Sequence, residues 1–262
     1  SFIKKIPESG AAIICADNPN AMKIAAAANR CITFGTKSPA DYEARNISFK
    51  ALTSTCQVWE QGQYLGSLDL AVPGVHSILN AMATVALARQ LGVDFGLIRK
   101  ALATFRGVQR RFQHLGTIND IYVVDDYGHH PTEIEATLGA AKQGRFNRTI
   151  CVFQPHRYSR TKFLYREFGA AFHHSDLLII TDIYPAGESP LPGVSSQLII
   201  DAVAAEAGPE TIHVPHLKDV IPCLLKLVQP GDLVLTLGAG NVWQAGAGLV
   251  RELSAVRQMV KA

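Results

Sequence analysis

The most constraining feature of this sequence is a regular alternation of short apolar runs and longer amphipathic stretches through its second half. The apolar runs predict five buried strands, at residues 121–124, 150–153, 177–181, 212–214 and 233–237. Helical patterns separate or follow them near residues 132–143, 161–174, 195–207, 218–228 and 242–259. Strands that alternate with helices form βαβ units, so this pattern predicts a parallel sheet with right-handed crossovers and helices on both faces.

The first half of the chain predicts a mixed arrangement. Two short buried strands with an Ala-rich helix between them are expected at residues 11–16, 31–34 and 21–29. Alternating apolar residues from Ile47 to Leu70, around a turn at Gln61-Gly62-Gln63, predict an antiparallel hairpin. Two helices are expected to follow, at Val75–Leu91 and Asp94–Phe105.

A break in this periodicity marks a domain boundary. The segment from Phe105 to Phe112 contains a glycine and three arginines, and 262 residues is a length that fits two domains. We therefore expect domains at residues 1–107 and 108–262, the second folding on its own and the first lacking strands for its helices to cover. The chain lacks an initial Met and soon enters a strand, so it is expected to begin inside a domain.

Composition excludes several classes of protein. Lys and Arg number 25 against 22 Asp and Glu, a net charge of +3 that is too small for non-specific nucleic-acid binding. No apolar stretch is long enough to span a bilayer, and the first residues do not resemble a signal peptide. The five cysteines have no zinc-ligand spacing. We expect a cytoplasmic protein with reduced thiols and neither nucleic-acid nor membrane partners; homo-oligomerisation is left open.

Polar residues crowd the loops after the first three strands of the second half. These loops are 125–131, 154–161 and 182–188, and ligands bind at such strand ends in parallel sheets. Thr132 and Glu135 have the spacing of a capping box at the first helix. Arg157 and Arg160 fall at a helix start, where the helix dipole disfavours cations, so we expect an anion nearby.

Three familiar signals do not define a site. A dinucleotide-binding GxGxxG motif would begin at Gly238, but Trp243 occupies the position of its third glycine. The phosphate-binding motif GxxxxGK[ST] is absent from the sequence. The histidine doublets lack metal-ligand spacing, so no metal site is expected. On the helix at 75–91, His76, Asn80 and Thr84 share one stripe, which is either a solvated face or a contact to a nucleotide base. An oxidoreductase and a binding module remain rival classes.

Three long motifs carry a specific resemblance. The sequence reads GVQRRFQ at 107–113, DDYGHHPTE at 125–133 and FQPHRYSRT at 153–161. With the stretches 182–193 and 231–240, these motifs resemble the Mur ligases of peptidoglycan synthesis, over essentially the whole chain. Within that family the motifs are most similar to the ligases that join L-alanine to UDP-N-acetylmuramate, and less similar to the murein-peptide ligases.

The resemblance implies an α/β fold. Residues 1–107 would be the later part of a P-loop-type central ATPase domain, and residues 108–262 a Rossmann-like C-terminal domain with a mostly parallel sheet. The reaction implied uses ATP and Mg²⁺ to activate the muramate carboxylate as an acyl phosphate, which L-alanine then attacks. The phosphate loop and the UDP-sugar domain would lie upstream, so the chain is expected to be inactive alone.

The resemblance also implies roles for eight residues. L-Alanine would be bound by Tyr127, His129, Arg157 and Arg160. ATP would be bound by His76 and Asn80 at the adenine, Arg111 at the phosphates and Asp126 at the ribose. No catalytic residue is assigned. Ser77 and Asn241 depart from the family, which commonly has Asn and Asp there, and the sequence does not fix alanine over serine or glycine.

Overall fold

The structure is a computed structural model that describes residues 2–261. The chain divides into two compact units, Ser1–Arg106 and Gly107–Ala262. Each unit has its own β-sheet. All five cysteines, which lie in the described part, are free thiols. No helix among the described residues is long and apolar enough to cross a membrane.

The first unit is built on a five-stranded sheet in the order β1-β2-β3-β4-β5. Its strands are β1 (Ala12–Cys15), β2 (Cys31–Gly35), β3 (Tyr42–Lys50), β4 (Thr53–Glu60) and β5 (Gln63–Leu70). The pairs β1–β2 and β2–β3 are parallel, whereas β3–β4 and β4–β5 are antiparallel. The predicted hairpin is thus the β4–β5 half of a three-stranded antiparallel ribbon, and β3 begins five residues before the predicted start.

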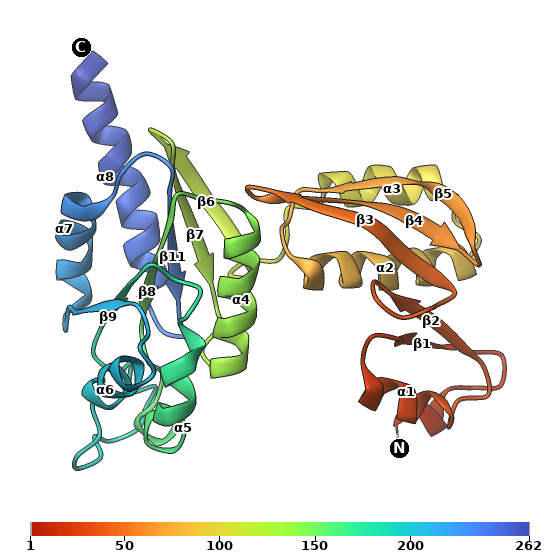
Figure 1. Cartoon of the computed structure of the whole chain (residues 1–262), viewed down its shortest axis with the longest axis horizontal. Coiled ribbons are helices and arrows are strands. Elements are labelled where there is room, and N and C mark those ends of the chain that lie inside the picture. Colours follow the sequence, from red (N-terminus) through yellow and green to blue (C-terminus); the bar gives the residue numbers. More distant parts are fainter. Residues whose placement is uncertain (1, 262) are drawn as a thin grey trace. The chain divides into compact units, whose positions relative to one another are not determined.

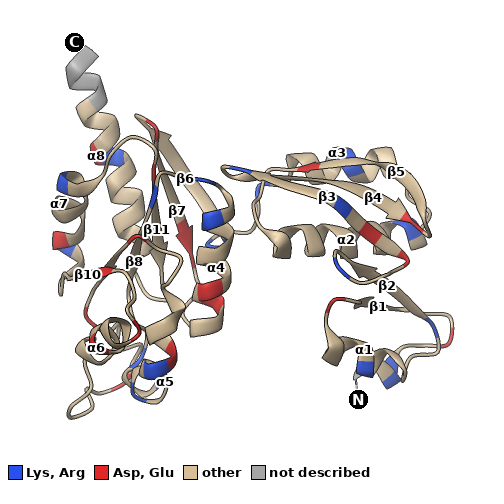
Figure 2. Ribbon diagram, in the orientation of Figure 1, with Lys and Arg blue, Asp and Glu red and all other residues tan. Residues whose placement is uncertain are grey.

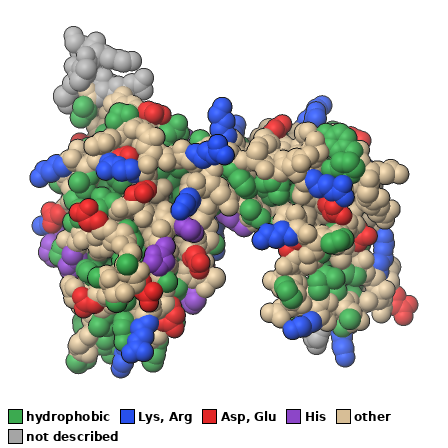
Figure 3. Space-filling model, in the orientation of Figure 1, with side chains coloured by type: hydrophobic (Ala, Val, Ile, Leu, Met, Phe, Trp, Pro, Cys, Tyr) green, Lys and Arg blue, Asp and Glu red, His purple; other side chains and the backbone are tan. Residues whose placement is uncertain are grey.

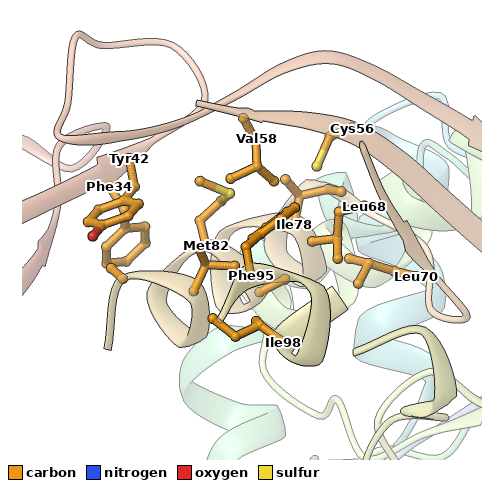
Figure 4. Packing of buried hydrophobic residues seen from close by; sticks show 14 of the residues in the cluster. Phe34, Tyr42, Cys56, Val58, Leu68, Leu70, Ile78, Met82, Phe95 and Ile98 are labelled. Carbon is orange, nitrogen blue, oxygen red and sulfur yellow. The ribbon is translucent and has the colours of Figure 1, made fainter. Parts of the chain in front are cut away.

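The helices of the first unit are η1 (Phe2–Lys5), α1 (Pro19–Ala25), α2 (Val75–Gln90) and α3 (Phe95–Thr104). The helix α1 begins before the predicted Ala21 because the Asn18 side chain caps the backbone N–H groups of Asn20 and Ala21. In Figure 4, α2 and α3 pack Ile78, Met82 and Phe95 against sheet residues that include Val58 and Leu68. The expectation that this unit lacks strands for its helices was therefore wrong.

The second unit is built on a six-stranded sheet in the order β10-β9-β8-β11-β7-β6. Its strands are β6 (Gln113–Ile118), β7 (Ile121–Asp126), β8 (Arg148–Phe153), β9 (Leu177–Ile180), β10 (Glu210–His213) and β11 (Asp232–Leu237). All pairs are parallel except β6–β7. This confirms the predicted α/β fold with a mostly parallel sheet. The edge strand β6 was not predicted.

Helices cover both faces of this sheet (Figure 1). They are α4 (Pro131–Gln143), α5 (Tyr158–Ala171), α6 (Gln197–Ala205), α7 (Leu217–Leu227) and α8 (Trp243–Lys261). The helices α4, α5 and α6 pack in sequence on one face, and α7 and α8 pack together on the other. Successive strand residues point to opposite faces, so Val123 joins the α7–α8 core while Val124 is buried on the other face of the sheet.

The start of α4 differs from the predicted capping box. Glu133, not Glu135, accepts the backbone N–H groups of His129 and His130, because the helix begins at Pro131. Thr132 lies inside the first turn. The fixed φ of Pro131 suits the first helical position, so the N-cap is His130, two residues before the predicted Thr132.

The α5 helix provides a test of the core. Phe168 is 1% exposed and packs its ring 5.4 Å from that of Phe153, whereas Phe163 on the same helix is 74% exposed. We expect Phe168→Ala to lower the free energy of unfolding of the second unit by about 3–5 kcal/mol, because it removes a buried ring and leaves a cavity. Phe163→Ala should change it by about 0.5 kcal/mol or less. Urea unfolding followed by near-UV circular dichroism checks both; similar losses would contradict this packing.

Candidate functional site

The candidate site lies where the strand order of the second unit reverses. From β7 the chain crosses to β8, continues to β9 and β10, and then returns to place β11 between β7 and β8. In open α/β sheets, ligands bind beyond the carboxyl ends of the strands at such a reversal. Because Tyr127 and His129 follow one strand and Arg157 and Arg160 the next along the chain, their placement in one pocket predicts that these two strands are neighbours in the sheet. This was wrong because β11 separates β7 from β8.

Two adjacent aspartates end β7 and are both buried, Asp125 at 1% and Asp126 at 5% exposed (Figure 2 shows acidic residues on this strand). Because they alternate along the strand, they face opposite sides of the sheet. Asp125 accepts hydrogen bonds from Thr236 Oγ1 at 2.6 Å and Arg110 Nε at 3.1 Å. Asp126 accepts the backbone N–H groups of Phe112 and Gly128, each at 2.7 Å.

Burial raises the pKa of Asp126, and the two backbone N–H groups oppose that shift. This carboxylate was predicted at the ribose of ATP. In the structure, its hydrogen bonds to Phe112 and Gly128 connect the segment before β6 to the loop after β7. A contact between Asp126 and the ribose stays a prediction.

Arg110 and Arg111 are adjacent but have different surroundings. The Arg110 guanidinium binds Asp125, donates to the carbonyl oxygens of Gly238 and Gly240, and lies 4.9 Å from the Tyr127 ring centroid. Arg111 is exposed, with Glu133 Oε1 4.0 Å from its guanidinium. The Arg111 side chain is 57% exposed, and a contact between Arg111 and the phosphates of ATP stays a prediction. Arg110 was not predicted to contribute to the site.

The two arginines at the start of α5 lie among other groups that favour an anion. Arg157 precedes the helix in a left-handed conformation, with φ +75°, and its side chain is exposed. Among the described residues, neither Arg157 nor Arg160 has a carboxylate within ion-pair distance. The protein itself supplies one negative charge at the helix start. Glu188 accepts hydrogen bonds from Ser159 N–H at 2.9 Å and from Ser159 O–H at 2.5 Å.

Four aromatic rings connect the loops that follow β7, β8 and β9. Tyr127 and His129 meet edge to face at 5.3 Å, and the His129 and His156 rings are 5.8 Å apart. His156 stacks on Tyr184 at 5.6 Å because a backbone bridge between these two residues extends the β8–β9 pairing. The chain of rings passes across the end of β11. The predicted alanine-binding residues Tyr127 and His129 therefore come close to the arginine loop although their strands are not adjacent.

The charges in this cluster shift several pKa values. Burial and then the neighbouring Arg160 lower the pKa of His156 to about 4, so its ring is neutral near pH 7. The neutral Nδ1 accepts a hydrogen bond from Arg160 at 3.1 Å, which fixes one edge of the guanidinium. Burial and the charge of Arg157 also lower the pKa of Arg160, although the group stays charged. A bound carboxylate would relieve this concentration of positive charge.

A cavity of about 390 Å³ opens beside the ring chain. It is lined by residues that follow β8, β9, β10 and β11, among them Gln154, Tyr184, Lys218 and Asn241. Gln154 is 6% exposed and donates from its amide to Asn241 Oδ1 at 3.0 Å, while its own Oε1 has no hydrogen-bond partner. A Cβ at Gly240 would overlap both Gln154 and Tyr184, so this turn has no room for a larger residue unless those side chains move.

The remaining predicted residues, His76 and Asn80, belong to the first unit. Both are exposed on α2, opposite the buried Ile78 and Met82. Thr84 shares their stripe and donates to the Asn80 carbonyl oxygen. The stripe is solvent-exposed in this unit, and an adenine contact there stays a prediction.

The described residues contain no cluster of three or more His, Cys, Asp or Glu that could hold a metal ion. On the face shown in Figure 3, positive and negative side chains are interspersed, and histidines gather on the second unit. Sequence reasoning missed Arg110, His156 and Glu188. His156 and Glu188 lie in the strand-end loops that the sequence marks as polar, whereas the role of Arg110 depends on contacts with residues far along the chain.

The titration of His156 predicts a pH dependence. Its folded pKa of about 4 lies below the ordinary 6.5, so between these values the unfolded chain binds a proton that the folded chain does not. Stability of the second unit should therefore fall as pH drops from 6.5 towards 4. His156→Gln, which cannot titrate, should reduce this fall in urea unfolding. His174→Gln, at an exposed position, should leave the fall of stability with pH as in the unsubstituted protein. An equal fall in all three proteins would show that His156 does not cause it.

Comparisons with known proteins identify the family. Residues 1–88 match the Mur ligase middle domain, and residues 110–240 match the Mur ligase, glutamate ligase domain. UDP-N-acetylmuramate–L-alanine ligases from Pelotomaculum thermopropionicum and Syntrophotalea carbinolica are 46% and 48% identical, over 96% of this chain and 55% of each relative. The chain thus spans about half the length of these curated relatives.

Solved structures agree with this match. The UDP-N-acetylmuramate–alanine ligase of Thermotoga maritima is 30% identical, with a TM-score of 0.71 over 86% of this chain and 48% of that one. A MurF ligase of the same organism, solved in complex with ADP, shares the fold at 18% identity, with a TM-score of 0.72 over 96% of this chain and 56% of that one. From its motifs, its two domain matches and its fold, we conclude that the chain belongs to the Mur ligase family.

Proposed function

We propose that the protein to which this chain belongs joins L-alanine to UDP-N-acetylmuramate in the cytoplasm, at the expense of ATP, during synthesis of peptidoglycan precursors. The observation that carries the proposal is the pair Arg157 and Arg160, which face no carboxylate partner within ion-pair distance among the described residues. Relatives at 43–48% identity are named for this reaction.

The arginine pair suits the carboxylate of an amino acid. A guanidinium binds both oxygens of a carboxylate with two parallel hydrogen bonds. Arg160 is held by His156 through Nδ1 and the backbone carbonyl oxygen, which fixes its direction before a ligand arrives. Preorganisation of this kind reduces the entropy lost on binding.

The rings of Tyr127 and His129 supply the other side of the proposed alanine pocket. Tyr127 is 37% exposed, so part of its ring is available to a ligand. His129 Nδ1 lies 3.0 Å from the Tyr127 carbonyl oxygen and 3.6 Å from Glu133 Oε2, contacts that fix the orientation of the imidazole. A small apolar side chain would pack against these rings, while the arginines bind the carboxylate.

On the nucleotide side, we propose that His76 and Asn80 contact the adenine, and that Arg111 reaches the phosphates with Asp126 near the ribose. The exposure of His76, Asn80 and Arg111 supports direct contact. Residues 1–107 would then be the later part of the central ATPase domain and residues 108–262 the amino-acid-binding domain. Mg²⁺ would be bound together with the phosphates of ATP, as is usual for this ion in ATP-dependent enzymes.

The proposed reaction has two steps. The γ-phosphoryl group of ATP moves to the muramate carboxylate, giving an acyl phosphate and ADP. The amino nitrogen of L-alanine then attacks the acyl carbon, the amide bond forms, and inorganic phosphate leaves as the nitrogen loses a proton. Residues of this chain would contribute by aligning the amine and by neutralising charge.

Activity assays test the proposal directly. In a protein that carries this chain and the upstream half of its relatives, we expect ADP release to require both UDP-N-acetylmuramate and L-alanine. A tripeptide of the cell wall in place of alanine tests the murein-peptide ligase alternative. Release that depends on the tripeptide and not on L-alanine would overturn the proposal.

The 262-residue chain by itself should not turn over ATP. It contains no GxxxxGK[ST] motif, whose backbone amides and lysine hold the transferred phosphates. Steady ADP release by this chain with both co-substrates would contradict the prediction. A control reaction uses the longer protein at the same concentration.

The arginine pair predicts a selective kinetic effect. In the longer protein, Arg157→Ala or Arg160→Ala should raise the KM for L-alanine about 10- to 100-fold, because each removes a charge-assisted hydrogen bond. The KM for ATP should change much less. If only the KM for ATP or UDP-N-acetylmuramate rises, the arginines bind phosphate instead.

A further inference from the structure

We infer that Arg110 is a positioning residue for the amino-acid pocket and that it acts by fixing the Tyr127 ring and the turn after β11. This inference rests on the proposed function. The two adjacent arginines would then have different roles. Arg111 would contact the nucleotide, whereas Arg110 would position the amino-acid pocket.

The contacts of the Arg110 guanidinium come from two distant parts of the chain, the end of β7 and the turn after β11. Nε binds Asp125 Oδ2 at 3.1 Å, Nη2 donates to the Gly238 carbonyl oxygen at 2.5 Å, and Nη1 donates to the Gly240 carbonyl oxygen at 3.2 Å. All three nitrogens are thus engaged in one planar fork. A lysine ammonium could keep the charge pair but could not reproduce this geometry.

Tyr127 completes the arrangement. Its ring centroid lies 4.9 Å from the guanidinium carbon of Arg110, and its backbone N–H donates to the Arg110 carbonyl oxygen at 2.8 Å. Tyr127 then meets His129, which approaches His156 of the arginine loop. One side chain therefore fixes the first ring of the chain of rings that forms the proposed alanine pocket.

The backbone around Arg110 keeps it in place. Arg110 has φ +58° and Phe112 has φ +44°, both in the left-handed region that non-glycine residues rarely adopt. Arg110 N–H donates to Gln113 Oε1, and Phe112 N–H donates to Asp126. These contacts maintain a conformation that turns the side chain of Arg110 inward while that of Arg111 is exposed.

A purely structural role would have a different kinetic signature. Loss of stability lowers the fraction of active enzyme and so lowers the apparent kcat, but it does not change the KM for one substrate alone. A displaced pocket wall raises the KM for that substrate selectively. The ratio of the KM changes for L-alanine and ATP therefore separates the two roles.

The experiment compares Arg110→Lys with Arg148→Lys in the longer protein. Arg148 forms the same kind of pair, with Asp232 at 2.6 Å and the Leu227 carbonyl oxygen at 2.9 Å, but at the opposite, amino-terminal end of β8 and β11. We expect R110K to raise the KM for L-alanine about tenfold and that for ATP less than about threefold. R148K should lower the melting temperature without changing the KM for L-alanine.

A second variant removes the risk that R110K fails to fold. Arg110→Met with Asp125→Asn takes away both charges, so no carboxylate is left buried and unpaired. It should also raise the KM for L-alanine about tenfold. The reason is that the variant loses the guanidinium that binds the turn after β11 and lies over the Tyr127 ring. A KM at the unsubstituted value in this double variant would show that Arg110 serves only to pair Asp125, and would overturn the inference.

The remaining outcomes separate this inference from the proposed function. If the unsubstituted protein requires L-alanine and R110K leaves the KM for L-alanine unchanged, the positioning role is wrong and the proposed function stands. An equal rise in the KM for ATP also overturns the positioning role. If the unsubstituted protein shows no dependence on L-alanine, the proposed function fails and the inference fails with it.

Discussion

The candidate site depends on the burial of two neighbouring carboxylates at the end of β7. Moving a carboxylate out of water is costly unless hydrogen bonds or an opposite charge replace its hydration. Asp125 obtains a guanidinium and a hydroxyl, and Asp126 obtains two backbone N–H groups. These partners lie in the segment before β6, in β11 and in the loop after β7, so satisfying the two carboxylates brings those three segments together.

The partners of these carboxylates include the parts that form the site. The segment before β6, the loop after β7 and the end of β11 all contact Asp125 or Asp126 directly, or through Arg110. Breaking such a pair by removing one partner costs about 3–5 kcal/mol, because a buried charge is left uncompensated. That is a large fraction of the stability of a domain, so the loops are held firmly without contributing apolar surface.

Local pattern predicted most of this fold because strands buried on both faces give continuous apolar runs. Leu177–Ile180 and Asp232–Leu237 show this, and both were recognised. The edge strand β6 was missed because it is partly exposed and its pairing with β7 is interrupted near Gly116. Strand order was also missed, since nothing local in β11 indicates that it inserts between β7 and β8. Glu188 caps a helix that begins thirty residues earlier, a contact that only the fold creates.

The fold of this chain is shared by ligases beyond those that carry out the proposed reaction. A MurF ligase with 18% identity has the same architecture at a TM-score of 0.72, so a shared backbone does not by itself define the proposed amino-acid specificity. That choice must come from side chains in the strand-end loops. A guanidinium pair recognises the carboxylate that every amino acid carries, which selects the class of substrate. Packing against rings distinguishes side chains that differ by a methyl group by only about 1–3 kcal/mol, so small displacements of Tyr127 or His129 would weaken the selection. Under the proposed function, residues that hold the rings would contribute to specificity even where they touch no substrate.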